Sequence, residues 1–151
     1  MPYDIGPLEG GEARGASRLL ALAAYLETVA DADYDHRAWR RGKADGSWAM
    51  CALGHGLSAL PDLIGLRWRS DEGDDVVRLD GSGLTEDPMR LAAEAFELSL
   101  EEAAMVFGVG LKTAAFYGEG GALRITPNAV SRAIRALALA KVAGARRAVA
   151  A

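Results

Sequence analysis

One cysteine and two histidines are the residues of this sequence best placed to do chemistry. His55 follows Cys51 by four residues and Trp48 precedes it by three, so a helix would present the indole, thiol and imidazole on one face. A thiol near a helix N-terminus has a lowered pKa, and a histidine one turn away can act as its base. The spacing is compatible with a cysteine nucleophile that uses His55 or His36 as its base.

The same residues also fit a buried, non-catalytic segment, which is the interpretation we favour. Cysteine is among the most buried residue types, and a helix face carrying Trp48, Cys51 and His55 is typical of a packed core. Catalytic cysteines usually take their histidine from a distant part of the sequence. We therefore treat Trp48, Cys51 and His55 as candidate ligand-binding residues. Catalysis by Cys51 with His55 or His36 is the alternative.

The small number of soft ligands argues against a metal site. A single cysteine excludes an intrachain disulfide and any zinc site built from several cysteines of one chain. The cysteine and the two histidines do not follow a familiar ligand spacing, so we predict neither a metal nor a cofactor. The sequence also lacks a complete catalytic or phosphate-binding motif.

The segment that carries these residues is predicted to be an interrupted helix. Residues 43–47 are predicted to form a turn, with Asp45-Gly46 as its strongest signal. Ser47 is placed to cap a helix over residues 48–60, and Pro61 stops it. Gly54 and Gly56 each cost such a helix about 1 kcal/mol relative to alanine. We expect the close approach of another backbone or of a ligand to offset that cost.

A second motif, over residues 99–117, resembles a helix-turn-helix. Ser99 and Glu102 form a capping-box pattern at its start. Ala104 supplies a small residue where two helices can cross, and Gly108, four residues later, fits the left-handed turn position.

DNA binding through this motif is the alternative to a purely structural role. The second helix offers Lys112 and Thr113 near its start, but the alanines and aromatic residues that follow are poorly suited to base edges or phosphates. Arg132 and Arg135 of the last helix would have to supply further positive charge. We favour the structural role.

Charge is divided unequally along the chain. Residues 1–120 carry 11 Lys and Arg against 21 Asp and Glu, whereas residues 121–151 carry six basic residues and no acidic one. A basic helix on an acidic body is usually solvated or neutralised within the molecule, which is what we expect. Contact with a nucleic acid or an acidic partner is the alternative.

Helical periodicity predicts a mainly α fold for the rest of the chain. We expect an irregular arm over residues 1–16 and a single helical domain over residues 17–151, in which Ser17 opens the first helix. Asp35 is placed to cap a short helix that Gly42 ends in the left-handed conformation. The remaining helices are expected at residues 17–30, 35–41, 88–97, 100–107, 111–117 and 126–144.

One β-hairpin is predicted between the helices. Apolar and charged residues alternate over residues 66–69, as in a half-exposed strand. Residues 71–75 form an acidic loop, and residues 76–79 can form the second, antiparallel strand. An isolated hairpin is marginal in water, so it should lie against the helices. The predicted fold is an irregular bundle of five to seven helices with one small inserted β-hairpin.

The run DGSWAMCALGHG, which contains Cys51, lies between an aromatic-containing short helix expected at residues 34–39 and a later alanine-rich helix. In this order of parts, residues 17–107 resemble a family of short bacterial and phage proteins of uncharacterised function that carries a Cys-Gly-Thr-x-x-Cys-x-x-Gly-Trp-Ala segment. Asp45 stands where the first cysteine would be, one residue further from Cys51, and His55 replaces the tryptophan. The missing first cysteine excludes two-cysteine chemistry here. The resemblance implies a shared helical fold and supplies no mechanism.

These features together favour a non-enzymatic binding or regulatory module. A helix-turn-helix DNA-binding regulator and a cysteine-dependent enzyme are the alternatives. The apolar runs are shorter than the ~20 residues that a bilayer span needs, and no basic stretch precedes them as in a signal peptide, so we expect a cytoplasmic protein without a membrane partner. An unidentified protein or small molecule is the expected partner, and the alanine-rich last helix can serve as a homodimer surface.

Overall fold

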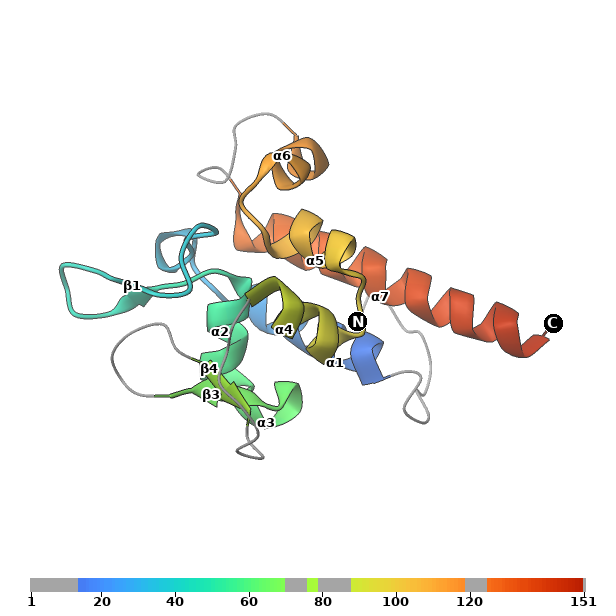
Figure 1. The fold of residues 1–151 in the computed structure, drawn as a ribbon. Helices are drawn as coiled ribbons and strands as arrows, with labels where there is room; N and C mark the ends of the chain where they lie inside the picture. Colours follow the sequence, from blue (N-terminus) through green and yellow to red (C-terminus); the bar gives the residue numbers. More distant parts are fainter. Residues whose placement is uncertain (1–13, 70–75, 79–87, 119–124, 151) are drawn as a thin grey trace.

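Helices dominate the computed structural model shown in Figure 1, which describes residues 14–69, 76–78, 88–118 and 125–150. Within these ranges the chain forms seven α-helices, one 3-10 turn and two separate antiparallel pairs of short strands. The predicted mainly α fold is confirmed, and the structure adds a second hairpin to the one expected. Most of the predicted arm over residues 1–16 and the predicted loop over residues 71–75 lie outside the described residues.

Two long helices form the centre of the fold. α1 (Arg14–Leu26) lies alongside α7 (Pro127–Ala150), drawn in blue and red in Figure 1. Each helix buries one face at helical spacing, as predicted. The buried residues include Leu19, Leu22, Ala23 and Leu26 of α1 and Val130, Ile134, Ala138 and Val142 of α7.

Both helices differ from the prediction at one end. α1 begins at Arg14 rather than at Ser17, and its Gly15 N–H donates a hydrogen bond to Glu97 Oε1 at 2.6 Å. This partner lies 82 residues away, so the local pattern could not reveal it. α7 continues to Ala150 instead of fraying after residue 144, because the residues beyond are mostly alanine and arginine, which are strong helix formers.

Three shorter helices follow one another as predicted: α4 (Pro88–Phe96), α5 (Leu100–Phe107) and α6 (Leu111–Tyr117). The capping box at the start of α5 is confirmed, since the Glu102 N–H donates to Ser99 Oγ at 3.0 Å and the Ser99 N–H donates to Glu102 Oε1 at 2.9 Å. The rings of Phe96 and Phe107 stack with their centroids 5.6 Å apart, which joins α4 to α5.

The helix predicted over residues 35–41 does not form. A 3-10 turn, η2 (Asp31–Asp33), is followed by an irregular stretch over residues 34–40. Long-range backbone hydrogen bonds hold this stretch in place. The Asp35 N–H donates to the Met50 carbonyl at 3.0 Å, and the Met50 N–H donates to the Asp33 carbonyl at 3.1 Å. A third bond, from the Cys51 N–H to the Ala38 carbonyl at 2.8 Å, takes an acceptor that a local helix would have used.

A small hairpin replaces the predicted start of the next helix. β1 (Arg41–Gly42) pairs with β2 (Trp48–Ala49), and Gly42 lies in a strand instead of ending a helix. The turn predicted at residues 43–47 is confirmed. Gly46 adopts a φ of 87°, and the Ser47 N–H donates to Asp45 Oδ1 at 2.9 Å, so Ser47 belongs to this turn and caps no helix.

The helix around the cysteine is shorter than predicted. α2 (Ala52–Ala59) takes Cys51 as its N-cap residue and ends before Pro61, which begins the single-turn α3 (Pro61–Ile64). The predicted hairpin follows, with β3 (Leu66–Trp68) antiparallel to β4 (Val76–Arg78), and Leu66 and Val76 belong to the core.

Candidate functional site

An open cavity of about 230 Å³ lies where the irregular stretch meets α2, α4 and α5. Most of its wall is apolar. The residues that line it are His36, Arg37, Ala38, Trp39, Cys51, Leu53, Met89, Phe107, Gly108 and Val109. It therefore contains two of the three residues considered for catalysis, Cys51 and His36, but neither His55 nor Trp48.

The thiol of Cys51 is not activated. Burial raises its pKa to about 11, although the backbone N–H groups of Leu53 and Gly54 at the start of α2 favour the thiolate. The lowered pKa that the catalytic alternative requires is therefore not found, because the thiol lies inside the protein rather than on an exposed helix end.

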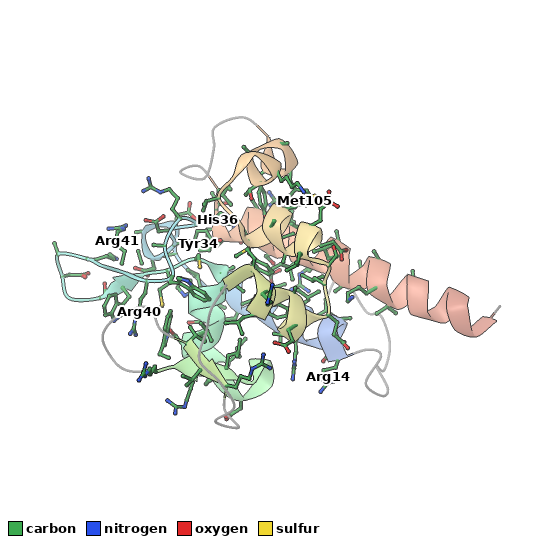
Figure 2. All side chains as sticks on the ribbon, viewed as in Figure 1. Arg14, Tyr34, His36, Arg40, Arg41 and Met105 are labelled. Carbon is green, nitrogen blue, oxygen red and sulfur yellow. The ribbon has the colours of Figure 1, made fainter. Side chains whose placement is uncertain are left out.

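His36 is held by Tyr34 and α6. Its Nδ1 shares a hydrogen bond of 2.8 Å with the Tyr34 hydroxyl, and its ring meets the Tyr117 ring edge to face at 5.7 Å. Figure 2 shows Tyr34 and His36 close together on the side of the molecule where α7 begins. Burial lowers the pKa of His36, and Gly108 and Asp35 only partly oppose that effect, so the ring is neutral near pH 7.

His55 lies next to this pair and does not line the cavity. Its ring stacks on Tyr34 with centroids 6.1 Å apart and an interplanar angle of 4°, and Tyr25 of α1 lies at 6.1 Å. The Nε2 atom lies 2.8 Å from the Asp33 carbonyl oxygen, to which it donates a hydrogen bond. Burial lowers the pKa of His55, and the Asp33 contact partly opposes that effect.

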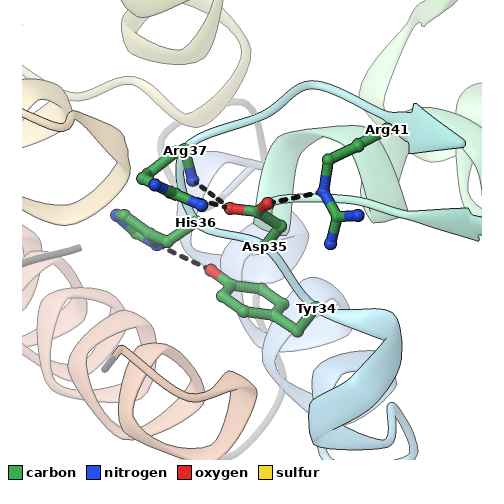
Figure 3. Close-up of polar contacts among 5 residues, drawn as sticks. All are labelled: Tyr34, Asp35, His36, Arg37 and Arg41. Carbon is green, nitrogen blue, oxygen red and sulfur yellow. Dashed lines mark hydrogen bonds and ion pairs between the residues drawn. The ribbon is translucent and has the colours of Figure 1, made fainter. Parts of the chain in front are cut away.

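One carboxylate beside the cavity is shared by two arginines (Figure 3). Asp35 accepts hydrogen bonds from Arg41 Nε at 2.9 Å, from the Arg37 backbone N–H at 3.0 Å and from Arg37 Nε at 3.4 Å. Burial opposes its ionisation, but these bonds outweigh that effect and lower the pKa of Asp35. The group is an ionised carboxylate with two guanidinium partners, and its net charge is positive.

The prediction that Trp48, Cys51 and His55 share one helix face is wrong, because Trp48 precedes α2. Trp48 lies on β2 with 41% of its surface exposed, and the Arg40 guanidinium lies 5.0 Å from its ring. The same guanidinium lies 4.2 Å from the ring of Trp68 on β3. Trp48 therefore belongs to a surface contact between the two hairpins.

Close packing against Trp39 explains why α2 has a glycine at position 54. A Cβ at this position would overlap the carbonyl oxygen of Trp39, so the irregular stretch packs directly on the helix backbone. The predicted close approach of another backbone is confirmed for Gly54. It places Trp39 in the cavity wall, which the sequence did not suggest.

α5 and α6 pack against each other as predicted, but the backbone conformation of Gly108 between them differs from the prediction. Gly108 has a φ of −78°, so the prediction of a left-handed turn position is wrong. Glycine fits there because a Cβ would overlap the Ala104 carbonyl and crowd Thr113 Oγ1. Thr113 is buried and donates to that carbonyl at 2.5 Å.

The four residues considered for DNA binding do not form one surface. Thr113 and Arg135 are buried, and Arg135 pairs with Glu27 at 2.8 Å, so neither can reach a duplex. Lys112 and Arg132 are exposed, and Lys112 lies 3.7 Å from Glu101.

Sequence reasoning missed most of the cavity wall. Arg37, Met89 and Phe107 come from segments that are far apart in the sequence, and no local motif connects them. The only available signal was Asp35, which the sequence places two residues before one arginine and six before another.

No protein-family model matches the chain, and neither a curated protein nor a solved structure is detectably similar to it. The His, Cys, Asp and Glu side chains of the described ranges do not gather in groups of three or more that could hold a metal ion. No helix in those ranges combines the length and the apolar character that crossing a bilayer requires.

Proposed function

We propose that this chain is a non-enzymatic binding module whose cavity accepts an apolar group of a small molecule. The observation that carries the proposal is the open, mostly apolar cavity of about 230 Å³ between the irregular stretch, α2, α4 and α5. Small-molecule sites are concave and mainly apolar, with a few polar groups that orient the ligand. Trp39, Met89 and Phe107 supply apolar surface, and Arg37 supplies charge.

The state of the chemical groups favours binding over catalysis. The Cys51 thiol is neutral, and no thiol–imidazole hydrogen bond connects it to either histidine within the described chain. One nitrogen of each histidine is engaged with the protein itself. A nucleophile needs a base within hydrogen-bond reach, and this arrangement supplies none.

The fold relationship and the cellular location are part of the same proposal. The proposed relationship to the bacterial and phage family is supported by α1, α4 and α5 at the expected places, whereas the aromatic short helix of that family's pattern is absent at residues 34–39. We propose a cytoplasmic location, in keeping with a single cysteine that is a free thiol. Fractionation of cells that express the chain tests the location.

Filling the mouth of the cavity tests the proposal. Val109 lines the cavity and is 61% exposed, so Val109→Trp should block the opening without disturbing the core. We expect benzyl alcohol to cause saturable shifts of the Ala38 and Leu53 amide signals in the wild-type NMR spectrum and at least tenfold weaker binding in the variant.

Leu100→Trp is the matched control. Leu100 is 54% exposed at the start of α5 and does not line the cavity, so this variant should bind benzyl alcohol as the wild type does. Equal binding by the wild type and Val109→Trp, or no binding by the wild type, would overturn the proposal.

A further inference from the structure

We propose that the cavity selects a small amphipathic carboxylate, with its apolar body inside and its carboxylate on the Arg37 guanidinium. This inference rests on the proposed binding function and adds the chemical class of the ligand. The observations that support it are the charge at the mouth of the cavity and the chemistry of its interior.

The mouth of the cavity carries an excess positive charge. Arg37 lines the cavity, and half of its side chain is exposed to solvent. Its Nε lies 3.4 Å from Asp35, whereas Arg41 makes the closer contact to the same carboxylate at 2.9 Å. Asp35 can neutralise one of the two guanidiniums, so the group keeps a net charge that an anion would balance.

A guanidinium is suited to a carboxylate in particular. Its planar array of N–H donors matches the two oxygens of a carboxylate, and its charge persists at any physiological pH. Asp35 occupies the Nε side of Arg37 only. The terminal Nη atoms of Arg37 are the part of the side chain that an incoming carboxylate would meet.

The interior of the cavity restricts the rest of the ligand. Cys51 and His36 are neutral, and the side chains of Trp39, Leu53, Met89, Phe107 and Val109 supply only apolar surface apart from one indole N–H. A sugar or a nucleotide would leave buried polar groups unpaired, which costs binding energy. The volume exceeds the ~150 Å³ of an apolar cavity that admits benzene, so one aromatic or short aliphatic group fits.

A matched pair of probes tests the charge requirement. 4-Phenylbutyrate and 4-phenylbutanamide share the same body and differ in the charge of one end. We expect the carboxylate to bind the wild-type chain at least tenfold more tightly than the amide, measured by calorimetry and by shifts of the Ala38 and Leu53 amide signals. Arg37→Gln should reduce this ratio to about one, and its amide spectrum should confirm that it is folded.

Arg132→Gln is the control, because it also removes one exposed positive charge but at a residue of α7 that does not line the cavity. It should keep the preference for the carboxylate within about twofold of the wild type. Equal binding of the two probes to the wild type, or an unchanged preference in Arg37→Gln, would overturn the carboxylate assignment and leave the binding function in place. Failure of both probes to bind would overturn both proposals.

Discussion

The two histidines are parts of a stack of rings that runs from Tyr25 through His55, Tyr34 and His36 to Tyr117. A tyrosine hydroxyl and a backbone carbonyl satisfy one nitrogen of each imidazole. A proton added to either ring would bring a charge into surroundings that cannot solvate it. The stack is therefore built for neutral rings, and it ties α1, α2 and α6 to the cavity wall.

Acid is expected to destabilise the protein through both histidines. Burial lowers the pKa of His36 and of His55 from 6.5, so below about pH 6.5 the unfolded chain takes up protons that the folded chain does not. The free energy of unfolding should fall as the pH drops through about 6.5 toward the lower folded pKa values, by at most about 1.4 kcal/mol per pH unit for each histidine. Urea denaturation across this range measures the slope.

Carboxylates do not explain such a slope. The pKa of Asp35 is lowered from 3.8, so its stabilising effect is lost only as the pH falls through the folded value, below about pH 4. His36→Gln should remove about half of the slope, and His36→Gln with His55→Gln should remove most of it. A slope that is unchanged in the double variant would show that other groups cause it.

At the scale of the elements, the contact between α2 and the irregular stretch decides the shape of the cavity. Gly54 lets the Trp39 carbonyl lie against the helix backbone, and the Cys51 N–H donates to the Ala38 carbonyl at 2.8 Å. These two contacts position Ala38 and Trp39 in the wall. A side chain larger than hydrogen at position 54 should therefore displace Trp39 and disturb the irregular stretch before β1.

Gly54→Ala tests this contact, because two effects predict opposite signs. Helix propensity alone would stabilise the variant by about 1 kcal/mol. Overlap of the new Cβ with the Trp39 carbonyl should dominate and destabilise it by about 1–3 kcal/mol. Urea denaturation measures the difference. Gly110→Ala is the control: nothing lies within 4 Å of a Cβ there, so it should show no overlap cost and only the roughly 1 kcal/mol or less that alanine costs at the N-cap of α6.

Elements specified by neighbouring residues could be predicted from the sequence. The capping box of Ser99 and Glu102, the turn at Asp45 and Gly46, and the hairpin at residues 66–78 depend on local chemistry, and each is present. The predicted helix over residues 35–41 failed for the opposite reason. Its backbone bonds to Met50 and Cys51, and periodicity carries no information on such distant partners.

The candidate site was only partly predictable for the same reason. Cys51 lines the cavity and His55 does not, so their helical spacing did not identify one site. His36 enters the cavity through its bond to Tyr34 and its contact with α6, which the fold alone determines. Met89 and Gly108 join the wall from α4 and from the end of α5.

Across the whole molecule, the basic last helix is partly neutralised by the body that it packs on. Arg135 of α7 is buried and pairs with Glu27, just beyond the end of α1, and Glu27 also accepts a hydrogen bond from Ser131 at 3.1 Å. Internal neutralisation, which the charge distribution favoured, is therefore observed at Arg135.

Removing the acid of this pair should destabilise the fold. Glu27→Ala removes the carboxylate that accepts from the buried Arg135 guanidinium, so we expect a loss of about 1–3 kcal/mol in the free energy of unfolding. Glu94→Ala breaks an exposed pair with Arg78 and should cost less than about 1 kcal/mol. Thermal or urea unfolding of the two variants compares them, and equal losses would contradict the special role of Glu27.

The Arg40 guanidinium between the rings of Trp48 and Trp68 has a further consequence for how the molecule responds to its surroundings. Two-stranded hairpins are marginally stable alone. Here the Arg40 guanidinium, which stays charged, contacts one tryptophan of each hairpin and so joins the two. Because arginine keeps its proton at every biological pH, acidification loosens the ring stack around His36 and His55 while the contact of Arg40 with the two tryptophans holds. We expect mild acid to open the chain from a single side, beginning at the wall that His36 shares with α6.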